Sequence, residues 1–112
     1  MRKGSYSVAG AEVAITAFPG EVGGVLANVN RWRGQAGLDP VDEAGLASVT
    51  SSFDSNGLHF VVFDASDAPQ PLVAAAAPWG GGTWFFKLTG PAAAVAQAKP
   101  AFLSLLKTVR AP

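Results

Sequence analysis

Short turn sequences between extended runs constrain the fold of this chain more than any other feature. Asn56-Gly57 separates the extended runs 51–54 and 58–64, and Asn-Gly is the strongest short signal for a β-hairpin. Glycine-containing turns at 9–11 and 80–82 end other runs in the same way. Because hairpins join antiparallel neighbours, these turns predict a mostly antiparallel sheet.

The remaining extended runs complete a sheet of about six strands. Runs 58–63 and 84–88 are apolar on both faces, which is typical of strands covered on two sides. Pro71 and Pro78 limit the run 72–77 to strand length. Its four alanines would favour a helix if the flanking residues allowed one. The predicted strands are residues 5–8, 12–18, 51–54, 58–64, 72–77 and 83–89.

Three segments have helical character. Residues 22–38 place apolar side chains at helical spacing, and this stripe can pack on a core; its members are Val22, Leu26, Val29, Trp32 or Arg33, and Ala36. Asp39-Pro40 has the sequence of a cap and first turn for a short second helix, with Asp42 and Glu43 near its positive end.

A final helix is predicted from Gly90-Pro91 to about Val109, and we expect Pro100 to bend it near Ala96. Its packing stripe comprises Val95, Phe102, Leu106 and Val109. The predicted order is β-β-α-(short α)-β-β-β-β-α. This order indicates a single α+β domain over residues 1–112, a three-layer α/β/α sandwich.

Composition limits the classes of protein to consider. Hydrophobic residues make up 49% and charged residues 14% of the 112 residues, as expected of a globular domain. Eight basic residues balance eight acidic ones, so no net field favours nucleic acid. We expect no membrane span, since no apolar run reaches about 20 residues. Met1-Arg2-Lys3 resembles the start of a signal peptide, but polar residues follow it, and we expect the chain to begin as a mature domain.

The helix 22–38 carries amides and arginines on its predicted polar face. Asparagine is a poor interior helix former because its side chain competes for backbone hydrogen bonds. Two interpretations are open: these side chains tie the helix to loop carbonyls or acids such as Asp39, or they form a surface for a partner. The candidate partner-binding residues are Asn28, Asn30, Arg31, Arg33 and Gln35.

Catalytic and metal chemistry finds little support. His59 is the single histidine and lies in a predicted strand, where a partly exposed structural residue is the simpler interpretation. Helix capping and turns account for two acidic groups, Asp39/Asp42/Glu43 and Asp64/Asp67. There is no cysteine, and no phosphate-binding glycine motif. We therefore expect no cofactor, no metal and no enzymatic activity.

Two segments carry a resemblance to a known family. GGVLANVNRWRGQAGL and TWFFKLTG look like the helix and strand of small bacterial domains with the Mog1/PsbP-like fold, and the resemblance spans essentially the whole chain. It implies an antiparallel sheet between helices and brings no catalytic set. Because many such bacterial domains are exported or lipoproteins, it also implies a periplasmic or lipoprotein-derived domain rather than a cytoplasmic one.

We therefore expect a non-enzymatic binding or accessory module that contacts a protein partner through helix 22–38 and adjacent loops. The alternative is a small-molecule-binding protein or weak hydrolase with a pocket near Trp79, Trp84 and His59. An apolar strand edge, or an aromatic patch formed by Trp79, Trp84 and the glycine turn between them, also allows a weak homodimer. The expected state is therefore a monomer or weak homodimer.

Overall fold

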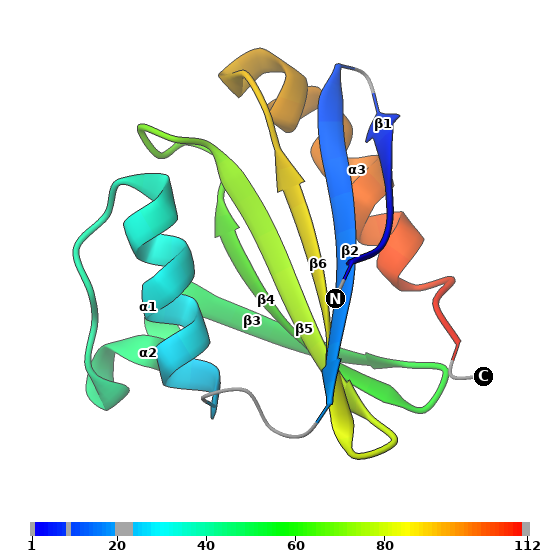
Figure 1. The fold of residues 1–112 in the computed structure, drawn as a ribbon. Coiled ribbons are helices and arrows are strands. Elements are labelled where there is room, and N and C mark those ends of the chain that lie inside the picture. Colours follow the sequence, from blue (N-terminus) through cyan, green and yellow to red (C-terminus); the bar gives the residue numbers. More distant parts are fainter. Residues whose placement is uncertain (1, 9, 20–23, 111–112) are drawn as a thin grey trace.

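The computed structural model describes residues 2–8, 10–19 and 24–110. Along the chain the elements are β1 (Arg2–Val8), β2 (Ala11–Pro19), α1 (Gly24–Ala36), α2 (Glu43–Val49), β3 (Thr50–Ser55), β4 (Leu58–Ala65), β5 (Leu72–Trp79), β6 (Gly82–Thr89) and α3 (Ala92–Leu106). Figure 1 shows α1 and α2 beside β3–β5, and α3 behind β2 and β6. Ala9 of the first predicted turn and residues 20–23, where the first helix was predicted to start, lie outside the described residues.

One antiparallel sheet has the strand order β1-β2-β6-β5-β4-β3. The predicted α+β class and antiparallel sheet are confirmed. Strands β3 to β6 form a meander, whereas β2 pairs with β6, more than sixty residues further along the chain. The α1 and α2 segment carries the chain from β2 to the far edge of the sheet at β3.

Of the turns that the structure describes in full, two are hairpin turns of only two residues. Asn56 and Gly57 have φ angles of 54° and 79°, and Gly80 and Gly81 have φ angles of 60° and 77°. Positive φ at both central positions is the requirement of a type I′ turn, whose twist suits a hairpin. The predicted Asn-Gly hairpin is confirmed. In the second hairpin the ladder continues to the Trp79–Gly82 pair, so β5 extends beyond its predicted end at residue 77.

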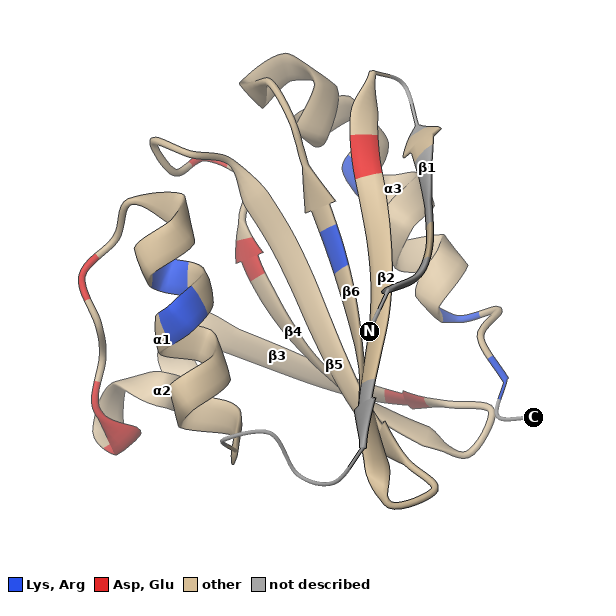
Figure 2. Ribbon diagram, in the orientation of Figure 1, with Lys and Arg blue, Asp and Glu red and all other residues tan. Residues whose placement is uncertain are grey.

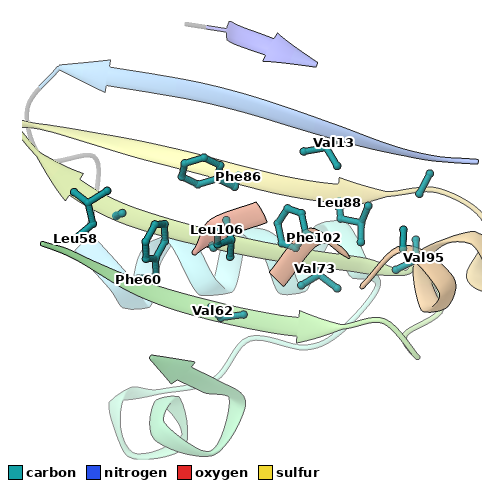
Figure 3. Packing of buried hydrophobic residues seen from close by; sticks show 14 residues of the cluster. Val13, Leu58, Phe60, Val62, Val73, Phe86, Leu88, Val95, Phe102 and Leu106 are labelled. Atoms are coloured by element: carbon teal, nitrogen blue, oxygen red, sulfur yellow. The ribbon is translucent and has the colours of Figure 1, made fainter. Parts of the chain in front are cut away.

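Side-chain alternation along the strands divides the core between the two sheet faces. Phe60, Phe86 and Leu88 belong to the cluster that includes residues of α3, and Figure 3 shows Phe86, Phe102 and Leu106 gathered between β6 and α3. Phe63 and Phe85 belong to a second cluster, with Trp32 of α1. The two main helices therefore cover opposite faces of the sheet.

The last helix, α3, passes through Pro100 without interruption. Val95, Phe102 and Leu106 are buried as predicted. The helix ends at Leu106 instead of Val109, because the next three backbone N–H groups bond three residues back, in tighter turns. Val109 still packs against the α3-side cluster. The bend near Ala96 stays a prediction.

The second helix begins later than the sequence indicated. Asp42, not Asp39, is the N-cap, and its side chain accepts a hydrogen bond from the Gly45 N–H at 2.9 Å. The prediction that Asp39-Pro40 caps and opens the helix is wrong, because side chains of α1 bond the backbone at residues 39 and 41.

Candidate functional site

Trp32 fixes the position of α1 on the sheet. Its ring stacks on Phe63 with centroids 6.3 Å apart and meets Phe85 edge-on at 6.2 Å. The side chain is 2% exposed, so the prediction that it anchors the core is confirmed. An indole in this position cannot stack on a nucleic-acid base.

Two of the candidate partner-binding residues hold the loop after α1. The Asn30 amide bonds Val41 twice: Nδ2 donates to the Val41 carbonyl and Oδ1 accepts from its N–H, both at 2.8 Å. One turn further on, the Arg33 Nε donates to the Asp39 carbonyl. For Asn30 and Arg33 the interpretation as ties to loop backbone is confirmed. Whether any of the five also binds a partner stays a prediction.

Asn28 was predicted to lie on the polar face of α1, but its side chain is buried. It is 6% exposed, and its Nδ2 donates to the Gly24 carbonyl at 2.8 Å. The sequence did contain a signal, because Asn28, Trp32 and Ala36 are spaced four residues apart and share one side of the helix. The apolar stripe was therefore drawn too narrow, and Asn28 is buried instead of lying on the exposed polar face.

Arg31 and Gln35 are exposed and lie beside β6. The Arg31 guanidinium carbon lies 5.5 Å from the centroid of the Phe85 ring. Two residues further along β6, the Lys87 Nζ donates to Gln35 Oε1 at 2.7 Å. Partial burial and the charge of Arg31 both lower the pKa of Lys87. Figure 2 shows these basic residues on α1 and β6.

A cavity of about 500 Å³ opens between α1 and the β5–β6 hairpin, and we call it the α1 cavity. Val25 and Trp79, which are 45% and 39% exposed, are the large hydrophobic side chains exposed in the described part of the chain, and both line it. Its other lining residues are Gly24, Asn28, Trp32, Val61, Ala76, Pro78, Gly80, Gly81, Gly82 and Thr83. Asn28 and Thr83 place an amide and a hydroxyl within an otherwise mostly apolar lining.

The predicted pocket of Trp79, Trp84 and His59 does not exist as one site. Trp84 packs against the α3-side cluster, and with Trp79 it lines a second cavity of about 70 Å³. His59 alternates with Leu58 and Phe60, which face α3, so it points to the opposite side of the sheet. The prediction is therefore wrong in including His59, because strand alternation separates Trp84 from His59, whereas Trp79 and Trp84 do share a cavity.

His59 forms an exposed pair with Asp54 on the β3–β4 hairpin, with Nδ1 2.7 Å from Oδ1. It lines neither of the two cavities that Trp79 borders. The interpretation of His59 as a partly exposed strand residue is confirmed.

The carboxylate of Asp64 also makes structural contacts, with Lys99 and Ser66. Partial burial raises its pKa, but hydrogen bonds from Lys99 and Ser66 and the charge of Lys99 outweigh burial, so the pKa lies below its ordinary value. The Lys99 Nζ lies 2.8 Å from Asp64 Oδ2. Among the described residues no group of three or more histidine, aspartate or glutamate side chains is arranged to hold a metal ion.

Helices within the described ranges are all too short or too polar to cross a bilayer. No protein-family model matches this sequence, and no curated protein matches it either. The α1 cavity and the polar residues beside it are therefore the observations on which a function can be argued.

Proposed function

We propose that this chain is a non-enzymatic binding module with a three-layer, Mog1/PsbP-like fold, and that the α1 cavity holds a small, mostly apolar ligand. The observation that carries the proposal is that Val25 and Trp79, the exposed large hydrophobic residues of the described chain, border the same cavity. Apolar side chains left in water around a concave site are typical of a binding surface. The helices on opposite faces of the sheet support the three-layer arrangement.

The size and lining of the cavity favour a small molecule. Its volume of about 500 Å³ falls within the range of about 300–1,000 Å³ common to ligand sites. Trp32, Val61 and Ala76 provide apolar surface. The amide of Asn28, which also lines the cavity, would orient a polar group on the ligand. The proposal includes no hydrolytic step, because His59 is not in this cavity.

A protein partner that docks on α1 is the second candidate. Of the five residues predicted for that surface, Asn28 is buried, while Asn30 and Arg33 hold the loop that follows the helix. Arg31 and Gln35 are the two exposed members, and their accessibility favours this candidate. A site formed by these two side chains alone is small, so we place it second.

Fluorescence titration with N-phenylnaphthylamine, a neutral apolar dye that brightens when it leaves water, tests the first candidate. We expect saturable binding by the wild-type protein. Ala76→Leu places a larger side chain in the lining of the cavity, which reduces its volume and should weaken binding at least tenfold. Ala96→Leu makes the same change on the exposed surface of α3 and should leave the affinity unaltered.

Thermal melts of both variants check that the fold persists, because inserting methylenes costs about 1–3 kcal/mol where space is short. The proposal is wrong if the wild-type protein binds no dye, or if folded Ala76→Leu binds it as tightly as the wild type.

A further inference from the structure

Two positive charges lie on the same face of the sheet as the α1 cavity. Thr83, Phe85 and Lys87 alternate along β6 and therefore share the face that α1 covers. Thr83 lines the cavity, Arg31 lies over Phe85, and Lys87 contacts Gln35. On this face, Arg31 and Lys87 therefore follow Thr83 along β6, beyond the cavity.

Within residues 2–8, 10–19 and 24–110, neither charge is neutralised by an ion pair. In the described part of the chain, no carboxylate forms an ion pair with Arg31 or Lys87. Lys87 donates instead to a neutral amide. Lys87 is half-buried as well. A half-buried lysine beside an arginine favours an anion in the place of the missing carboxylate.

We propose that the ligand of the α1 cavity is an apolar organic acid whose anionic group lies between Arg31 and Lys87 while its body fills the cavity. This inference rests on the proposed function of the cavity. Four residues separate Thr83 from Lys87, a span of about 13 Å at the usual rise of a strand. The ligand is therefore a molecule with an apolar body at one end and its acid group at the other.

The charge arrangement supports one anionic group on this ligand. The Arg31 guanidinium presents a planar set of donors suited to a carboxylate. Lys87 has three N–H donors and uses one of them on Gln35. Both side chains can therefore donate to the same acid group without breaking the contacts that hold them.

A matched pair of dyes tests the inference. Anilinonaphthalene sulfonate carries the aromatic body of N-phenylnaphthylamine with a sulfonate added. The wild-type protein should bind the sulfonate dye about tenfold more tightly than the neutral one, and added salt should weaken only the sulfonate dye. Displacement of the bound sulfonate dye by naphthaleneacetate, but not by naphthalene-ethanol, would extend the result to carboxylates.

Charge-removing variants locate the anion. Lys87→Met and Arg31→Gln should each weaken sulfonate-dye binding about tenfold, the usual size of a lost charged hydrogen bond, and leave neutral-dye binding unchanged. Lys107→Met removes an exposed lysine that lies over Phe53, away from the cavity, and should change neither. Lys87→Gln serves in place of Lys87→Met if the latter does not fold.

The outcomes separate the two proposals. If both dyes bind but Lys87→Met and Arg31→Gln leave the affinity for the sulfonate dye unchanged, the acid ligand is wrong and the cavity stands. If the neutral dye does not bind at all, the proposed function fails. If the sulfonate dye binds and Ala76→Leu does not weaken it, the anion site is independent of the cavity, which also overturns this inference.

Discussion

Asn30→Ala tests whether the polar side chains of α1 serve the fold. The Asn30 amide makes two hydrogen bonds with Val41, each 2.8 Å long, and a hydrogen bond of this kind contributes about 1 kcal/mol net. Their loss costs about 2 kcal/mol, while alanine regains about 0.6 kcal/mol of helix propensity. The free energy of unfolding should therefore fall by about 1–2 kcal/mol.

This loss should lower the Tm by about 4–8 °C, because a domain of about 100 residues melts roughly 4 °C lower for each kcal/mol lost. Circular dichroism melts and urea titrations measure the change. Gln35→Ala is the control: it removes one exposed contact with Lys87 and should alter the free energy by no more than about 0.5 kcal/mol.

Limited proteolysis gives a second readout, since Asn30→Ala should speed cleavage within residues 38–42. An Asn30→Ala protein that melts at or above the wild-type Tm, with unchanged cleavage, would refute the assignment of Asn30 to the fold. It would return Asn30 to the candidate partner surface.

Two further predictions follow from the turn geometry and from Asp64. Gly57 has a φ of +79° and open space around an added Cβ, whereas Gly34 lies inside α1 with equally open space; Gly57→Ala should therefore lose about 1–2 kcal/mol to backbone strain and Gly34→Ala should gain about 0.5–1 kcal/mol. Urea titration measures both, and changes of the same sign would contradict the argument. The folded-state pKa of Asp64 lies below its ordinary value of 3.8, so its stabilisation is present above that pH and is lost as the pH falls through the lowered pKa. Asp64→Asn should accordingly flatten the fall of Tm below about pH 4, and an unchanged fall of Tm would show that the contact with Lys99 contributes nothing.

Local signals in the sequence predicted the elements well, because their causes lie within a few residues. Asn56 and Gly57 adopt the positive φ angles that their types allow, and the apolar spacing of Val95, Phe102 and Leu106 marked the buried side of α3. The predicted ends of helices were less accurate where side chains from another element bond the same stretch of backbone. Asp42 caps α2 in place of Asp39 because Asn30 and Arg33, on another helix, bond the loop before it.

The candidate site was predicted only in part. Trp79 does border a cavity, but Asn28 is buried beside it, while Trp84 and His59 face opposite sides of the sheet. Alternation along β4 and β6 was readable from the sequence. Which residues of the two strands share a face was not, since that depends on the register in which each strand pairs with β5.

The sequence by itself determined the turns, the helical and extended runs, and the residues that pack inward, since each follows from backbone preference and periodicity. Only the tertiary structure decided that β2 pairs with β6 and that α1 begins beside the β5–β6 hairpin. Those contacts join segments about fifty to seventy residues apart, and their free energy comes from surfaces that meet only after the chain has folded. The α1 cavity and its neighbouring charges, Arg31 and Lys87, are products of that meeting.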